Sequence, residues 1–272
     1  MTMSTAVEPK PDRRVLVRSL APLATSSALM AAGILLSLTA ADRVEAEDVV
    51  DGVMLLLFPA VGALLLMRRR APRVALLFQG VGLLAASGFL AGGASEHEWA
   101  GRSVSGVVAS VAFTATISLL LAVTPYFFPD GHLPSRRWRP VVAVSVLAAA
   151  LSCVTILLTP GAVDEDSAEL GDNPLGIGGL ASLLHALELL SFVAFAACAL
   201  LGVASLLRRL HGADRRTRRQ IATLGVGVAV LVGLFLLDST LQSIGGQAYG
   251  VVAAVIALGA VPLAAGLALL RD

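Results

Sequence analysis

In the stretch VSGVVASVAFTATISLLLAVTPYFFPDGHLPSRRWRP, residues 104–140, a long apolar run ends in a turn and a basic cluster. Its apolar part, residues 104–128, exceeds the roughly 20 residues that a helix needs to cross about 30 Å of hydrocarbon. No water hydrogen-bonds the backbone at that depth, so such a segment has to be helical. The arginines that follow are typical of a loop on the cytoplasmic side of a membrane.

Seven further apolar stretches occur along the chain, and all eight together predict an all-α, polytopic integral membrane protein with eight transmembrane helices. Composition agrees, because only 14% of the residues are charged, against about 25% in soluble domains. We expect residues 1–12 to be a disordered cytoplasmic tail and residues 13–272 to form a single transmembrane domain. The predicted spans are about 19–41, 49–67, 73–94, 104–128, 138–159, 179–207, 220–240 and 249–270.

Two of the predicted helices are expected to be irregular. The second span is the weakest, since it is short, has Asp51 near one end and has Pro59 inside it. Pro262 is expected to kink the eighth helix, because proline removes a backbone hydrogen bond and its ring crowds the preceding turn.

The distribution of basic residues predicts the orientation of the chain. Eighteen of the 20 Lys and Arg residues lie in the terminal segments and in every second gap, and only Arg43 and Arg102 lie in the other gaps. The positive-inside rule then places both termini in the cytoplasm, an N-in/C-in topology. We expect a multi-pass protein of the plasma membrane with bilayer lipid around it. The net charge of +1 gives no sign of a nucleic-acid partner, and none is expected.

Local motifs give no indication of catalysis. Cys153 and Cys198 lie within apolar stretches and are expected to be packing residues rather than a disulfide. The sequence has no Cys/His spacing typical of a metal site, no ATP-binding motif and no recognisable Ser/His/Asp arrangement. We therefore expect no catalytic residue, no metal and no cofactor, although local motifs leave an intramembrane enzyme open.

The turn between the fourth and fifth spans is the sharpest motif. In Pro129-Asp130-Gly131, proline presets φ, aspartate accepts local hydrogen bonds and glycine tolerates positive φ. The arginines and the tryptophan that follow suit the headgroup layer of a membrane. These residues form either a rigid hairpin at the interface or a docking surface for a cytoplasmic partner. The candidate docking residues are Pro129, Asp130, Gly131, Arg136, Arg137, Trp138, Arg215, Arg216, Arg218 and Arg219.

Four short segments, in order, carry a resemblance to a known family. The segment from Phe127 to Pro140 is similar to "LLFPDGRLPSRRWRP" in the membrane-spanning N-terminal region of actinobacterial sensor histidine kinases, except that His132 replaces an arginine. Three further segments of this chain resemble later parts of that region, namely Asn173-Pro174-Leu175-Gly176, Arg218-Arg219-Gln220 and Val261-Pro262 through Leu270-Arg271.

The resemblance implies a sensory or regulatory module without its kinase. In that family a dimerisation domain and an ATP-binding domain follow the last helix, whereas this sequence stops at Arg271-Asp272. Such a module would pass an outer or intramembrane stimulus to a cytoplasmic kinase, response regulator or other regulator, and it could pair with a second copy of itself. The sequence leaves open whether the protein is naturally kinase-less or part of a longer chain.

Polar residues inside the apolar stretches gather toward the outer ends of the sixth and seventh spans. His185 and Glu188 are three residues apart and therefore share a helix face. About 20 residues separate Glu188 and Asp238 from the basic loop 208–219, which places both acids near the outer boundary, where a charge costs less than at the bilayer centre. They are either solvated groups at the rim or, with Gln242, a shared polar site whose protonation could bias helix packing.

Two other functions stay open at this point. A small transporter or permease component would need a continuous polar path with charges near the midplane, which this sequence does not show. A structural or assembly subunit would tolerate loss of the polar groups at the outer rim, so neutralising them would separate that role from sensing.

Overall fold

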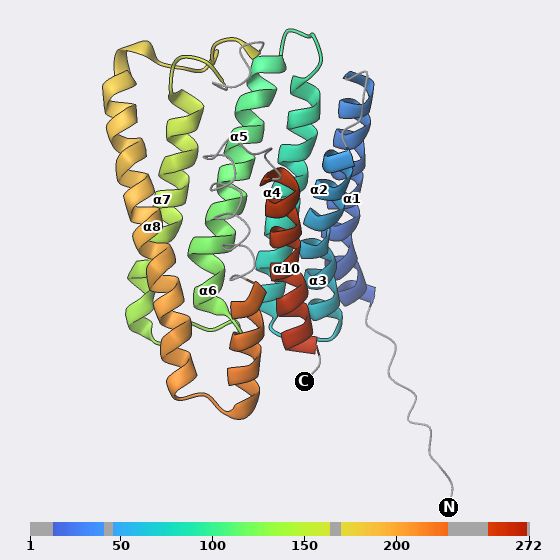
Figure 1. Cartoon of the computed structure of the whole chain (residues 1–272), viewed down its shortest axis with the longest axis vertical. Coiled ribbons are helices and arrows are strands. Elements are labelled where there is room, and N and C mark those ends of the chain that lie inside the picture. Colours follow the sequence, from blue (N-terminus) through green and yellow to red (C-terminus); the bar gives the residue numbers. More distant parts are fainter. Residues whose placement is uncertain (1–12, 41–45, 164–169, 228–249, 271–272) are drawn as a thin grey trace, which may run out of the picture.

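A computed structural model describes residues 13–40, 46–163, 170–227 and 250–270 of the chain. These residues form helices joined by short loops, with no β-strand among them, and most helices run along one long axis (Figure 1). Five of the helices are long and apolar enough to cross a membrane, which is the pattern of a multi-pass membrane protein. The all-α prediction is therefore confirmed for the described residues, whereas the predicted tail 1–12 lies outside them.

The helices follow the predicted spans closely. The long ones are α1 (Arg13–Ala40), α4 (Pro72–Ser95), α5 (Arg102–Ser118), α7 (Arg139–Leu158), α8 (Ala181–His211) and α10 (Gly250–Leu270). The short ones are α2 (Ala46–Leu55), α3 (Leu57–Met67), the π turn η1 (Leu119–Val123), α6 (Thr124–Phe127), and the 3₁₀ turns η2 (Arg136–Trp138) and η4 (Gly178–Leu180). Residues 215–227 are also helical, and the rest of the predicted span 220–240 lies outside the described residues.

The second predicted span is broken in two at Leu56, where α2 ends and α3 begins. The cause is Pro59, which has no N–H to donate to the carbonyl of Leu55 and whose ring crowds that carbonyl. The ring fits against α4 because residue 82 there is glycine: a Cβ at Gly82 would lie 2.3 Å from the Cδ of Pro59. By contrast, α10 continues as a helix through Pro262, and its predicted kink stays a prediction.

The fourth predicted span is not one α-helix, because the π turn η1 interrupts it just before Pro125. Proline cannot donate to the carbonyl of Leu121, and the N–H of Thr124 bonds back five residues to the carbonyl of Leu119. The hydroxyl of Thr124 donates to the same carbonyl at 2.9 Å. The helix therefore changes its register directly before the turn at residues 128–132.

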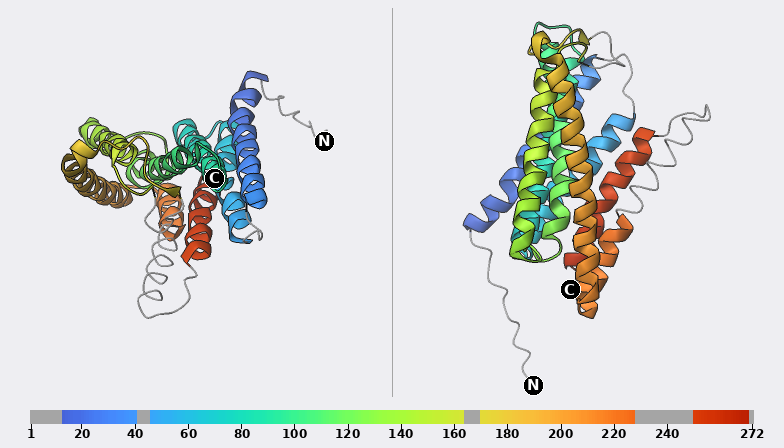
Figure 2. Two further views of the ribbon diagram at one scale, coloured as in Figure 1. Left: turned by 90° about the horizontal axis from the view of Figure 1, so that it is seen from above. Right: turned by 90° about the vertical axis from the view of Figure 1, so that its left-hand side faces the viewer.

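A cluster of buried apolar side chains lies among α3, α4, η1, the helix at 215–227 and the C-terminal part of α10. In it the rings of Phe58 and Phe78 meet edge to face, with centroids 5.6 Å apart. In contrast, α8 packs mainly on α7 at one side of the bundle (Figure 2), and many of its apolar side chains are exposed. Leu189, Phe192 and Leu200 are more than 60% exposed, as expected of a helix that faces lipid.

The basic connections gather at one end of the bundle, the lower end in Figure 1. The loops around 68–71, 128–138 and 212–214 lie there together with the first turn of α1 and the last turn of α10, and we call this the basic end. The loop 96–101 and the segments 159–163 and 170–177 lie at the opposite end. One boundary was wrong: Arg208 and Arg209, predicted in a loop, belong to the last turn of α8, because that helix extends to His211.

Candidate functional site

The turn after α6 forms a compact hairpin at the basic end. The N–H of Gly131 donates to the carbonyl of Phe127 at 2.6 Å, and the φ angle of Gly131 is +78°, a conformation that favours glycine. The carboxylate of Asp130 accepts a hydrogen bond from the N–H of His132 at 3.1 Å. The aspartate and the glycine therefore each have the local role that turn chemistry assigns to them.

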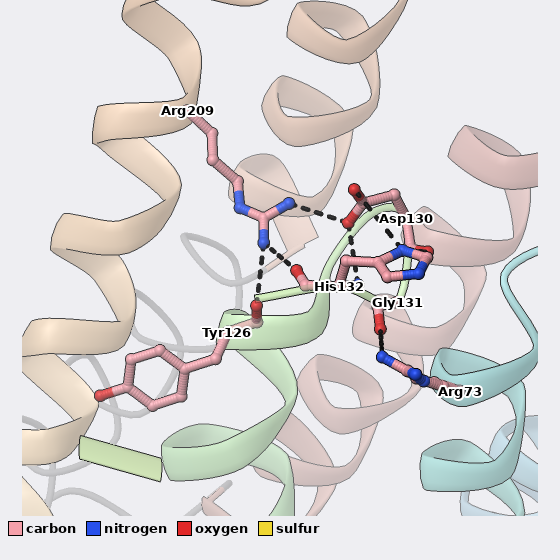
Figure 3. A network of polar contacts seen from close by, with 6 residues as sticks. All are labelled: Arg73, Tyr126, Asp130, Gly131, His132 and Arg209. Carbon is pink, nitrogen blue, oxygen red and sulfur yellow. Dashed lines mark hydrogen bonds and ion pairs between the residues drawn. The ribbon is translucent and has the colours of Figure 1, made fainter. Parts of the chain in front are cut away.

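Arg209 of α8 holds this hairpin through three acceptors (Figure 3). Its Nη1 donates to Oδ1 of Asp130 at 2.9 Å, and its Nη2 donates to the carbonyl of Tyr126 at 3.0 Å and to the carbonyl of His132. The arginine side chain is only 13% exposed, whereas that of Asp130 is 57% exposed. Because the donor is charged and the guanidinium is planar, one side chain fixes both arms of the hairpin to α8. We call these contacts the Arg209 clamp.

Two further contacts attach the hairpin to its neighbours. Arg73, at the start of α4, donates to the carbonyl of Gly131 at 3.2 Å. The buried hydroxyl of Tyr126 donates to the carbonyl of Cys198 on α8 at 2.5 Å, and the Tyr126 ring lies 5.7 Å from that of Trp138. The hairpin is thus held by both α4 and α8.

The structure divides the predicted docking residues into two groups. Pro129, Asp130 and Gly131 are engaged by the rest of the molecule, which favours the rigid-hairpin alternative for them. The ring of Trp138 lies beside that of Tyr126, tilted by 45°. The other group consists of exposed arginines at the basic end, namely Arg136, Arg137, Arg215, Arg216, Arg218 and Arg219. The side chains of this second group are exposed at the surface of the basic end.

Sequence reasoning missed the roles of Arg209 and Arg73. Arg209 is 79 residues from Asp130 in the chain, and Arg73 is 58 residues from Gly131, so no local spacing reveals either contact. One sequence feature could have indicated a role for Arg209. It falls in the last turn of a very long apolar helix, where an arginine has to find acceptors or reach the headgroup layer.

A cavity of about 880 Å³ opens beside the clamp at the basic end. Its charged lining consists of Arg70, Arg208, Arg209, Arg216, Asp130 and Asp214. Asp214 accepts a hydrogen bond from the N–H of Thr217 at 3.1 Å, which caps the helix at 215–227. Hydrogen bonds from the hydroxyl and the N–H of Thr217 lower the pKa of Asp214, so this carboxylate is ionised at neutral pH.

The predicted outer site is only partly within the described residues. His185 and Glu188 lie near the start of α8, with Nδ1 and Oε2 3.8 Å apart and side chains 86% and 55% exposed. Both line a cavity of about 440 Å³ between α5, α7 and α8, in which the hydroxyl of Ser152 donates to that of Ser191 at 3.0 Å. Asp238 and Gln242 lie outside the described residues, so their part in this site stays a prediction.

Metal ligation has no basis in the part of the chain that the structure describes, since no three His, Cys, Asp or Glu residues there are grouped to hold an ion. Cys153 and Cys198 are free thiols, and the latter is buried against α6 through its carbonyl. The arrangement of described residues offers charge and hydrogen-bond donors at the basic end and a weakly paired acid and imidazole at the other end.

Comparison with known protein families, with curated proteins and with solved structures gives no significant match for this chain. No family is shown. The resemblance to sensor histidine kinases therefore stays a prediction, and the function has to be argued from the two ends of α8.

Proposed function

We propose that the chain is an eight-helix, N-in/C-in protein of the plasma membrane that acts as a non-catalytic sensory or regulatory module. It passes an outer or intramembrane stimulus to a cytoplasmic kinase, response regulator or other regulator. The topology is supported by the gathering of the arginine-rich connections at one end of the bundle, since such segments are retained in the cytoplasm.

The observation that carries the signalling role is that one helix, α8, bears both candidate sites. His185 and Glu188 stand in its second turn, and Arg209 stands in its last turn. The 24 residues between His185 and Arg209 correspond to about 36 Å of helix, which is close to the full thickness of the hydrocarbon core. A change at the outer pair therefore has a continuous rigid element through which to reach the hairpin.

A small movement of α8 is the proposed signal. Interface helices in switching proteins shift by about 1–2 Å, and such a shift would break the short hydrogen bonds between Arg209 and the hairpin. The same movement would displace the loop 212–214 and the exposed arginines of the helix at 215–227 that follows it. These arginines, chiefly Arg215, Arg218 and Arg219, are the proposed contact surface for the partner.

In-cell photo-crosslinking from position 211, with the adducts identified by mass spectrometry, tests the proposal. His211 is exposed at the end of α8, and a matched probe at Trp99, exposed at the opposite end, is the control. Capture of a kinase, response regulator or transcription factor at position 211 but not at 99 is the expected result. Capture of only lipid or copies of the chain at position 211 would contradict it and favour a transporter or an assembly subunit.

A further inference from the structure

The cavity at the basic end has an excess of positive charge. Four arginines and two aspartates line it, which leaves two positive charges in excess. Both aspartates already have partners inside the protein: Arg209 binds Asp130, and the N–H of Thr217 binds Asp214. Within the described residues, no carboxylate lies within ion-pair distance of Arg70 or Arg208.

The walls of this cavity combine those cations with apolar side chains. The apolar lining includes Leu133 and Pro134, which follow the hairpin, Ala71, which precedes α4, and Leu269 of α10. Leu269 also belongs to the buried apolar cluster, so the cavity borders the core of the bundle on one side and the loops of the basic end on the other. A volume of about 880 Å³ lies within the range of roughly 300–1,000 Å³ that is usual for small-molecule sites.

We propose that this cavity binds a phosphate group, presented by the headgroup of an anionic membrane lipid. Arginine is suited to phosphate because its planar guanidinium makes two parallel charge-assisted hydrogen bonds. Basic pockets between transmembrane helices on the cytoplasmic side take phospholipid headgroups for this reason. The apolar wall matches the glycerol and upper acyl region of a lipid, which a free anion does not have. The site does not depend on the proposed signalling role.

Native mass spectrometry of the detergent-solubilised full-length protein, titrated with dioctanoyl phosphatidylglycerol, tests the site. The double variant R70Q/R208Q removes two cavity arginines, and we expect at least tenfold weaker binding than in the unmodified protein, about 1.4 kcal/mol. The matched control is R136Q/R137Q, which removes two exposed arginines from the same end but outside this cavity. We expect the control to change binding less than twofold.

A second variant tests the site independently, in case the first variant weakens binding only by losing structure. Ala213→Asp places a negative charge at the cavity lining without removing any side-chain contact of the native residue, and it should weaken lipid binding at least fivefold. Equal weakening in R70Q/R208Q and in R136Q/R137Q, or unchanged binding in both R70Q/R208Q and Ala213→Asp, would overturn the proposal.

The source of the phosphate is decided by two further titrations. Glycerol 3-phosphate carries the anion without acyl chains, and dioctanoylglycerol carries the chains without a phosphate. Binding of phosphatidylglycerol at least tenfold tighter than either compound assigns the site to an anionic lipid. Equal binding of glycerol 3-phosphate assigns it to a soluble phosphate compound, and equal binding of dioctanoylglycerol would contradict a phosphate-specific site of either kind.

Discussion

The two ends of α8 carry similar chemistry in very different surroundings. At the basic end, Arg209 is 13% exposed and contacts a carboxylate and two carbonyls. At the opposite end, His185 and Glu188 are mostly exposed, and the Nδ1 atom of His185 approaches Oε2 of Glu188 only to 3.8 Å. The first arrangement fixes a hairpin in place, whereas the second costs little to rearrange, because exposed ion pairs contribute about 0–1 kcal/mol.

Under the proposed function, this difference suits the two ends of α8 to different roles. In that proposed function, a group that responds to a stimulus has to change its contacts at low cost, and the exposed pair at His185 and Glu188 meets that condition. A group that reports movement has to lose defined contacts when the helix moves, and Arg209 meets it. Substitutions at both ends of α8 test this contrast.

Arg209→Ala is expected to have the largest effect on stability. It removes the guanidinium donor from Asp130 and from the carbonyls of Tyr126 and His132, and hydrogen bonds to charged groups contribute about 1.5–3 kcal/mol. We expect a loss of about 2 kcal/mol, measured as the free energy of unfolding in detergent. Arg208→Ala, on the neighbouring exposed residue, is the control, and an equal loss in both variants would show that the clamp is not specific.

Asp130→Asn is expected to cost less, about 1 kcal/mol, because the amide oxygen still accepts a hydrogen bond while the charge is lost. A double-mutant cycle with Arg209→Ala measures the interaction between the two residues. We expect a coupling energy of about 1 kcal/mol. Additive effects of the two substitutions would mean that the salt bridge contributes nothing to the clamp.

Tyr126→Phe removes the hydroxyl that donates to the carbonyl of Cys198 and leaves that carbonyl without this partner. We expect a loss of about 1 kcal/mol in the unfolding free energy, since this is the usual value for one buried hydrogen bond. The ring contact with Trp138 is preserved in the variant. A change within experimental error would indicate that Tyr126 contributes only through its ring.

The double variant H185Q/E188Q is expected to have the smallest effect, within about 0.5 kcal/mol, because both side chains are exposed. Thermal unfolding of the full-length protein in lipid nanodiscs measures it. A loss above 1 kcal/mol would show that the outer pair supports the fold, which would remove the contrast with the basic end.

The helices could be predicted from the sequence, but the contacts of the candidate site could not. Apolar length alone located α4, α7 and α8, because a lipid-spanning segment has to be helical. The break at Leu56 also follows from Pro59, whereas the π turn before Pro125 was not predicted even though the same missing N–H causes it.

The Arg209 clamp depends on how α8 packs beside α6, and that geometry is set by contacts between distant segments. The sequence identified Asp130 and Gly131 correctly as turn residues because turn chemistry is local. It gave no reason to choose Arg209 over Arg208, since which of two adjacent helix residues faces the hairpin depends on the rotation of α8.

Hydrogen–deuterium exchange of the hairpin amides in nanodiscs tests the central claim, that α8 couples its two ends. The amides of Gly131 and His132 are hydrogen-bonded within the hairpin and report its opening. Arg209→Ala should accelerate their exchange in any case. The double variant H185Q/E188Q changes residues about 36 Å away along α8. If α8 couples its two ends, this variant changes the exchange rate of these amides at least threefold while the free energy of unfolding is unchanged. Identical exchange in this variant and the unmodified protein would contradict coupling through α8.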